Sequence, residues 1–242
     1  MQIKNNILKI VLVSLLALGF SACEDNESSN KIKSEKKVKL SKPEWDNRLT
    51  NYKNTIEWYQ LADNDEIAAS NIGVVYSKEI KDYKKAIEWY LYSDSIKTDA
   101  GTLLGLATSY EDIKNYETSI KYYKKSFELG NKNSAYNLAL LYENILKDDK
   151  NSEIWYKKGI EKKNLSCLKG IISLYYKNNE YIKTSAYMIN IITYPNFTKE
   201  EVINRLKNYY KFNNETIKKG YELQLTMPGL PKRYMGKLDL DE

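Results

Sequence analysis

The chain has 242 residues, of which 42% are hydrophobic and 29% are charged, so most of it is expected to fold, as one medium-sized domain or a short repeat array. It contains 10 glycines and 4 prolines, low numbers that favour helices over a β-rich structure. The absence of histidine removes the usual general base and the usual zinc ligand. Basic and acidic residues are interleaved almost everywhere despite a net charge of +6, which indicates a solvated surface rather than a nucleic-acid interface.

Residues 1–22 have the pattern of a signal peptide. Lys4 and Lys9 give a positive start, residues 10–20 (IVLVSLLALGF) form an apolar core, and two small residues, Ser and Ala, follow. The apolar stretch is shorter than the ~20 residues of a membrane-spanning helix. We therefore predict a cleaved signal peptide over residues 1–22 rather than a permanent membrane helix.

Residues 20–23, FSAC, resemble the lipobox of bacterial lipoproteins, with Phe20 where that box usually has Leu or Val. The resemblance implies cleavage before Cys23 and diacylation of this cysteine, and two or more acyl chains anchor a protein stably to a membrane. A chance cysteine after an ordinary signal peptide is the alternative. A lipid-linked Cys23 leaves Cys167 as a free thiol, which we predict to be a small buried packing residue rather than a reactive group.

Two short motifs alternate along the middle of the chain. The first contains an aromatic pair and recurs at a nearly constant interval, as TIEWY at 55–59, AIEWY at 86–90, SIKYY at 119–123 and SEIWY at 152–156, with a degenerate copy, SAYMI, at 185–189. The second motif is apolar and closes with Tyr76, Tyr110, Tyr142 and Tyr175. Two alternating segments in a unit of about 33 residues indicate repeated helix pairs.

The side chains of the repeat predict how these helices pack. Gly73, Ala107 and Ala139 would let a neighbouring helix approach, and an aromatic side chain would fill the remaining gap. The aromatic residues predicted to lie in the core are Trp58, Trp89, Tyr122 and Trp155. Because each pair buries its apolar faces only against its neighbours, we predict an all-α fold over residues 43–195, a right-handed α-solenoid of stacked antiparallel helix pairs.

The repeats resemble those of the tetratricopeptide family, and more specifically its Sel1-like branch, over roughly residues 55–195. The best stretch is SIKYYKKSFELGNKNSAYNLALLYEN, residues 119–144, which has the order of a WYxKA-type second helix, a glycine turn and an LGxxY-type first helix. The chain departs from the family at Ile172, where a small residue is usual, and at positions 119, 152 and 185, where Ser replaces Ala. The resemblance implies that the first helices line a concave groove for a peptide or a partner helix.

The same resemblance provides candidate groove residues. They are Ser70, Val74, Ser77, Leu104, Thr108, Glu111, Tyr136, Leu140, Glu143, Lys169, Ser173 and Tyr176. Two glutamates, Glu111 and Glu143, would make the middle of the groove acidic. Two lysines, Lys169 and Lys177, would make its far end basic and orient a partner of complementary polarity. For each candidate, an ordinary solvated surface residue is the alternative.

The segments that flank the repeats are expected to be a tether, two caps and a tail. Residues 23–42 are charged and poor in apolar side chains, so we predict a disordered tether. Pro43 would begin a first helix that caps the N-terminal end. Thr198 and Glu201 have the spacing of a capping box at the start of C-terminal capping helices over residues 196–226, and the tail 227–242 should be extended.

No catalytic signature accompanies the repeats. The sequence has no phosphate-binding loop, no G-x-S-x-G motif and no metal-ligand cluster, so we expect neither a cofactor nor a metal. Ser166 and Lys169 form a Ser-x-x-Lys pair, but such a spacing is expected by chance here and the companion Lys-Thr-Gly is absent. Cysteine-rich Sel1-like proteins reported to bind penicillin carry a cysteine pair in each repeat, which this chain does not. We therefore predict that the chain is not an enzyme.

These observations predict a protein of the bacterial periplasm, lipid-anchored to the inner or the outer membrane, that acts as an interaction scaffold. It would bind an envelope protein or peptide in the groove of its repeats, and no nucleic acid is expected. The alternatives are an outer-membrane assembly factor, a cell-wall-associated enzyme or penicillin-binding Sel1-like protein, and a structural or immunity protein. The sequence favours no particular oligomeric state.

Overall fold

The computed structural model describes residues 38–240. The predicted signal peptide, Cys23 and most of the predicted tether lie outside the described residues. Every regular element within residues 38–240 is helical, which confirms the predicted all-α fold. No helix in this part of the chain is both long and apolar enough to cross a membrane.

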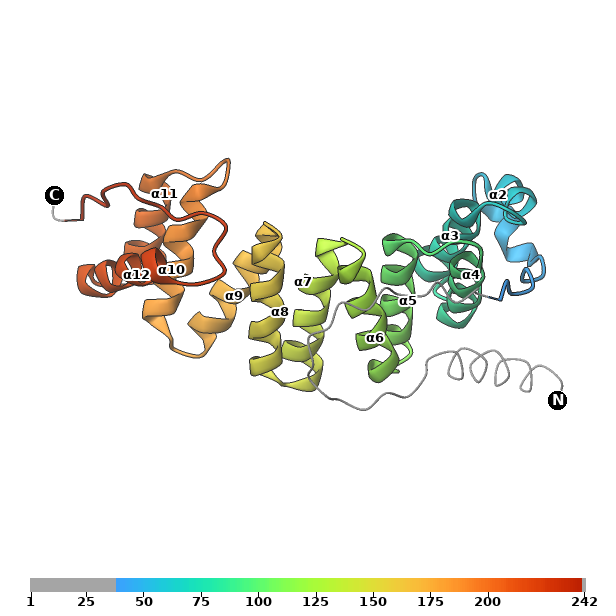
Figure 1. The fold of residues 1–242 in the computed structure, drawn as a ribbon, viewed down its shortest axis with the longest axis horizontal. Helices are drawn as coiled ribbons and strands as arrows, with labels where there is room; N and C mark the ends of the chain where they lie inside the picture. Colours follow the sequence, from blue (N-terminus) through green and yellow to red (C-terminus); the bar gives the residue numbers. More distant parts are fainter. Residues whose placement is uncertain (1–37, 241–242) are drawn as a thin grey trace, which may run out of the picture. The chain divides into compact units, whose positions relative to one another are not determined.

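The helices follow one another in antiparallel pairs, and each packs against the next along the chain (Figure 1). The first two elements are η1 (Asn47–Asn51) and α2 (Thr55–Leu61). The pairs that follow are α3 (Glu66–Val74) with α4 (Tyr83–Ile96), α5 (Ala100–Asp112) with α6 (Tyr116–Glu128), α7 (Lys132–Leu140) with α8 (Asp149–Glu161), and α9 (Leu165–Lys177) with α10 (Tyr181–Asn190). The chain then continues through η4 (Ile191–Thr193), α11 (Lys199–Asn204), η5 (Arg205–Tyr209) and α12 (Asn214–Thr226). This arrangement is the predicted solenoid of stacked helix pairs.

The turn inside each pair is built the same way. One residue adopts the left-handed backbone conformation that ends a helix, and an acidic or amide residue near it caps the next helix. The left-handed residues are Lys81, Lys114, Lys147 and Asn179. The capping side chains that accept a backbone N–H are Asp82, Asn115 and Asp148. The turn therefore recurs once in every repeat although its left-handed residue is not glycine.

The uneven spacing of the repeated tyrosines has a structural cause. Two of the first helices end in a π-helical turn, η2 (Val75–Ile80) and η3 (Leu141–Leu146), which adds one residue before the next cap. The Asp82 N–H donates to the Tyr76 carbonyl six residues back, whereas the Asn115 N–H donates to the Tyr110 carbonyl five residues back. Because of the added residue, the caps of the second helices recur at a nearly constant interval, whereas the tyrosines that end the first helices do not.

Close helix packing depends on aromatic rings set against glycines. The ring of Tyr90 lies between two first helices, and a Cβ added at Gly73 or Gly105 would lie 2.8 or 2.5 Å from it. Trp89 and Trp155 are buried, as predicted. The equivalent Trp58 and Tyr122 are half-buried. The prediction that small residues admit neighbouring helices is thus confirmed at Gly73.

Cys167 is a fully buried free thiol, in agreement with its predicted packing role. It lies against α8, where a Cβ added at Gly159 would be 2.2 Å from its sulfur. Burial raises the pKa of the Cys167 thiol to about 12. The side chain is therefore neither exposed nor ionised at neutral pH.

The N-terminal end differs from the prediction. The prediction of a helix that begins at Pro43 is wrong. The chain instead forms the 3₁₀ turn η1 and then turns at Asn54, whose φ is 65°, before α2 begins. The last residues of the predicted tether also contact the helices. The Leu40 N–H donates to Ser95 Oγ at 3.0 Å, and Lys42 Nζ lies 2.7 Å from the Asp63 carboxylate.

The tail after α12 is not helical and packs against the preceding helices. The buried Gln224 side chain donates to the Tyr234 carbonyl at 2.8 Å and accepts the Tyr234 N–H at 3.1 Å. Asn190 donates to the Lys232 carbonyl at 2.6 Å. The buried apolar residues of the tail are Met227, Leu230, Leu238 and Leu240. These contacts make the tail part of the C-terminal cap.

Candidate partner-binding site

The structure distributes the predicted groove residues over three levels of burial. The exposed ones are Val74, Lys169, Ser173 and Tyr176. The half-buried ones are Ser70, Leu104, Thr108, Glu111, Tyr136 and Leu140. Ser77 and Glu143 are buried, so these two side chains present little surface to a partner.

Three groove candidates are held by tyrosines of the second helices. These tyrosines occupy equivalent positions in successive repeats, and each meets the first helix of its own pair. Tyr123 donates its hydroxyl to Glu111 at 2.7 Å, and Tyr156 donates to Glu143 at 2.8 Å. The Tyr90 and Ser77 hydroxyls lie 3.2 Å apart. The predicted acidic middle of the groove is therefore occupied by contacts within the chain.

Burial sets the protonation of one of these pairs. It raises the pKa of the Glu111 carboxyl, and the hydrogen bond from Tyr123 only partly offsets this effect. Burial and the neighbouring Glu111 together raise the pKa of the Tyr123 phenol. The phenol stays protonated at neutral pH and remains the donor.

The fourth helix pair breaks this pattern. Ile189 stands at the position equivalent to Tyr156, so no tyrosine hydroxyl is supplied there, and Tyr176 stands where the earlier pairs have Ser77 or a glutamate. The Tyr176 ring instead contacts other aromatic rings. The centroid distances are 4.8 Å to Tyr210, 6.0 Å to Tyr181 and 6.3 Å to Phe212. Tyr176 thus remains open to solvent on one side.

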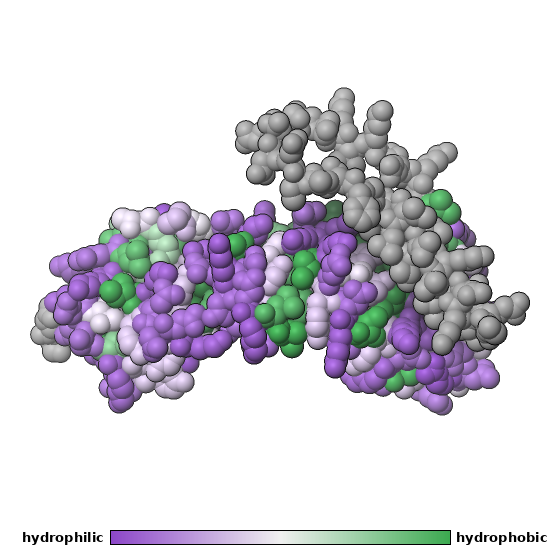
Figure 2. Space-filling view, turned by 90° about the horizontal axis from the view of Figure 1, so that it is seen from below, coloured by the Kyte–Doolittle hydropathy of each residue, from purple (hydrophilic) through white to green (hydrophobic). Residues whose placement is uncertain are grey.

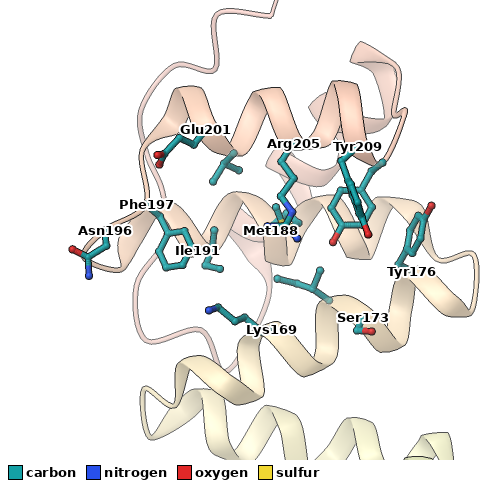
Figure 3. Close-up of a pocket in the computed structure, with 13 residues that line it drawn as sticks. Lys169, Ser173, Tyr176, Met188, Ile191, Asn196, Phe197, Glu201, Arg205 and Tyr209 are labelled. Atoms are coloured by element: carbon teal, nitrogen blue, oxygen red, sulfur yellow. The ribbon is translucent and has the colours of Figure 1, made fainter.

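A pocket of about 650 Å³ lies next to Tyr176 (Figure 3). Its walls come from α9, α10 with η4, the following loop, and α11 with η5. The lining residues are Lys169, Ile172, Ser173, Tyr176, Met188, Ile191, Asn196, Phe197, Glu201, Val202, Arg205, Tyr209 and Tyr210. The pocket brings together three predicted groove residues, Lys169, Ser173 and Tyr176, and the other nine do not line it.

The pocket forms because the order of helix packing changes at this end of the array. In the earlier pairs, the helix that follows a second helix along the chain packs directly against it. Here α12, rather than α11, packs closely on α10, and a Cβ added at Gly220 would lie 2.5 Å from Ser185. Since α11 makes far fewer contacts with α10, a hollow remains below α11 and η5.

The pocket floor is apolar and its margin is aromatic. Ile172, Met188, Ile191 and Val202 are all buried and close the bottom of the hollow. Phe197, Tyr209 and Tyr210 lie around it, and Tyr209 is 66% exposed. Such a surface offers apolar area together with hydroxyl groups, as interface tyrosines commonly do.

Two cations face the hollow from opposite walls. Arg205 extends from η5 toward α9, and Lys169 lies on α9 below it (Figure 3). Lys169 Nζ is 5.6 Å from the Phe197 ring centroid, and Arg205 Cζ is 5.3 Å from that of Tyr209. Within residues 38–240 neither cation forms an ion pair, whereas Lys177 lies 3.9 Å from Asp149. Of the two lysines predicted to make this end basic, Lys169 lines the pocket and Lys177 does not, and the second cation of the pocket is Arg205.

The carboxylate of the pocket has a structural role. Glu201 accepts the Thr198 N–H at 3.0 Å and the Thr198 hydroxyl at 2.9 Å, while the Glu201 N–H donates to Thr198 Oγ at 3.2 Å. This is the predicted capping box, and it holds the pKa of Glu201 below its usual range. In Figure 3 the Glu201 side chain points away from the hollow.

Sequence reasoning missed the half of the pocket that α11 and η5 supply. Arg205, Tyr209 and Tyr210 lie in a segment predicted to be a terminal cap. The recurrence is visible in the structure, where Lys211 has the left-handed backbone about one repeat length after Asn179 and the helix turn recurs. That turn indicates a further helix-turn-helix unit.

Two kinds of chemical group considered from the sequence can be placed in the described part of the chain, possible metal ligands and the Ser-x-x-Lys pair. Among the described residues, no cluster of three or more Cys, Asp and Glu side chains could hold a metal ion. Ser166 is exposed on α9 but does not line the pocket with Lys169. The face in Figure 2 is largely hydrophilic, with hydrophobic residues in separate patches, one of them at the end where α10–α12 lie.

The fold resembles that of a solved repeat protein. No protein-family model matches the chain, and no curated protein matches it in sequence. The crystal structure of c5321, a protective antigen present in uropathogenic Escherichia coli strains that displays an SLR fold, superposes with a TM-score of 0.52. The match has 17% sequence identity and covers 70% of this chain. It spans 39% of that protein, so the likeness concerns the fold of the repeats.

Proposed function

We propose that this chain, which has the Sel1-like repeat (SLR) fold, is an interaction scaffold that binds a segment of a partner protein in the pocket below α11 and η5. The observation that carries the proposal is the pocket itself, which has a volume of about 650 Å³ and a buried apolar floor. A hollow of this size receives a few large side chains. The exposed Tyr209 and the Arg205 guanidinium belong to the residue types that dominate protein interfaces.

The repeat array explains how such a site is held in place. Each helix pair is fixed by its neighbours, so the pocket walls are supported by α8 on one side and α12 on the other. A site on rigid helices needs little ordering when a partner binds, which favours affinity. The array acts in this proposal as a support, and the partner contacts its C-terminal end.

Site-specific photo-crosslinking in intact bacteria tests the docking site. A photoreactive phenylalanine at Tyr209 should form a discrete adduct with a protein, whereas the same group at the exposed Lys124 of α6 should not. Ser173→Trp places a large ring in the pocket and should suppress the adduct. Ser166→Trp, on the exposed surface of the same helix, should leave it intact. Equal adducts in both tryptophan variants would argue against the pocket.

The cellular location is a second part of the proposal. The lipobox-like FSAC and the preceding apolar stretch support a lipoprotein of the bacterial periplasm whose partner is an envelope protein. Metabolic labelling with an alkyne fatty acid should modify the chain. Cys23→Ala should abolish labelling, while Cys167→Ala should not. Labelling that survives Cys23→Ala would contradict the anchor.

A further inference from the structure

We infer that the pocket selects an acidic segment of its partner, in which one large apolar or aromatic side chain is flanked by aspartate or glutamate. The inference rests on the proposed function and specifies the chemistry of the partner. It follows from three features of the pocket: its charge, its floor and the limited extent of its basic surface.

The pocket has an excess of positive charge. Lys169 and Arg205 face the hollow from opposite walls, and neither forms an ion pair in the described part of the chain. The carboxylate of Glu201 accepts two hydrogen bonds from Thr198 and points away. A bound carboxylate would therefore meet two cations that no carboxylate of the described residues already pairs with, each beside an aromatic ring that excludes some water.

The floor of the pocket selects an apolar side chain. Ile172, Met188, Ile191 and Val202 provide buried aliphatic surface in the lining, whereas the polar Lys169, Ser173 and Arg205 are exposed. A large side chain inserted here would lose contact with water, while acidic neighbours on the same segment would reach the cations above. Met188 is flexible and adapts to side chains of different shape.

The extent of the basic surface favours a peptide over a membrane. Attraction to an anionic bilayer usually needs a cluster of about 4–8 basic residues on one face. The pocket offers two, and the acidic Glu200 is exposed in the first turn of α11. Two cations above an apolar floor match a segment with a few acidic residues and one anchor side chain.

Peptide display tests the inference. Random ten-residue peptides would be selected on the immobilised full-length chain and on its Lys169→Glu/Arg205→Glu variant. The wild-type pool should be enriched in Asp and Glu around Phe, Trp, Leu or Met. A synthetic copy of the best peptide should bind the double variant at least tenfold more weakly, and about 0.5 M salt should also weaken its binding. Fluorescence anisotropy measures both effects.

A matched control separates pocket charge from net charge. Lys84→Glu/Lys124→Glu changes the net charge equally at two exposed lysines of α4 and α6, and should leave the affinity within about twofold. Circular dichroism would check that both variants fold. If the charge-reversed pocket variant does not fold, Lys169→Gln/Arg205→Gln replaces it, and a loss of affinity is still expected.

The other outcomes are equally informative. An acidic pool that binds wild type and pocket variant alike would overturn the inference. A neutral or basic pool that depends on the pocket would overturn acidic selection and leave the docking proposal in place. Recovery of no pocket-dependent peptide would overturn both, as would pocket-dependent binding to phosphatidylglycerol vesicles alone.

Discussion

Three tyrosines of the second helices each place a buried hydroxyl against the first helix of the same pair. A buried phenol needs a hydrogen-bond partner, and the residue directly after the closing tyrosine of the first helix supplies it. Glu111 and Glu143 fill this role in the second and third pairs. In the fourth pair Ile189 needs no partner, so Tyr176 at the equivalent position is free to line the pocket. Two linked changes in the repeat, Ile189 and Tyr176, thus convert a structural position into a surface one.

Glu111→Gln should change the pH dependence of stability in a defined direction. Burial raises the pKa of Glu111 in the folded state, so the stabilisation from its protonated form is present below the unfolded pKa and is lost as pH rises through the folded pKa. At pH 7 the variant should therefore be more stable than wild type, and the difference should shrink as the pH falls and Glu111 becomes protonated. Urea unfolding as a function of pH measures this difference.

The control for this prediction is Glu128→Gln, which removes an exposed carboxylate from the same helix pair. Its unfolding free energy should follow that of wild type at each pH. If Glu111→Gln were less stable than wild type at pH 7, the hydrogen bond from Tyr123 would outweigh the cost of burying the charge.

At the scale of helices, close approach is set by the glycines that meet Tyr90. Gly105→Ala introduces a Cβ 2.5 Å from Cζ of the Tyr90 ring, and overpacking of this kind costs about 1–3 kcal/mol. The better helix propensity of Ala offsets about 1 kcal/mol of this cost, so a net loss of up to about 2 kcal/mol is expected. Urea unfolding followed by circular dichroism measures the free energy of unfolding.

Gly101→Ala is the matched substitution in the same helix. The only nearby side-chain atom is Oδ1 of Asp99 at 3.0 Å, which caps α5 and would have to shift by only a few tenths of an ångström. The gain in helix propensity should then dominate and raise the free energy of unfolding by up to about 1 kcal/mol. Equal destabilisation by both substitutions would show that loss of glycine, rather than contact with Tyr90, is responsible.

Helices and their pairing could be predicted from the sequence because the signal is local and repeated. The aromatic pairs that end at Tyr90, Tyr123 and Tyr156 recur at one interval, and the fold places each in the same environment. The incorrect prediction of a helix at Pro43 relied on the sequence of one segment only, and in that segment Asn54 adopts a left-handed backbone. A pattern supported by several copies therefore predicted structure better than one supported by propensity alone.

Half of the pocket could not be predicted by extending the groove along equivalent positions. Lys169, Ser173 and Tyr176 were identified because they belong to a repeated first helix. Arg205 and Tyr209 follow Pro195, where the aromatic motif stops, and their position depends on α12 packing against α10. That exchange of neighbours is a tertiary effect, which the local sequence of α11 does not encode.

For the molecule as a whole, the C-terminal end of the helix array needs extra stabilisation and is also the end that forms the pocket. Interior pairs gain support from two neighbours, whereas a terminal pair has one and needs a cap. The tail supplies part of this cap, since the Leu240 carbonyl accepts from Lys207 of η5 at 3.1 Å and from Asn214 of α12 at 2.9 Å. Lys199 of α11 also pairs with Asp239. The last described residues therefore hold α11 and η5 in the position that forms the pocket.

Leu238→Ala/Leu240→Ala should loosen this end without unfolding the array. Both leucines are buried, and truncating a buried leucine weakens its anchorage by about 2 kcal/mol or more. Hydrogen exchange should become at least tenfold faster in α11 and η5, while α4–α6 keep their protection. Met235→Ala, in the same tail but 74% exposed, should change neither. Exchange that accelerates equally in all helices would instead indicate one cooperative unit and remove the special role of the tail.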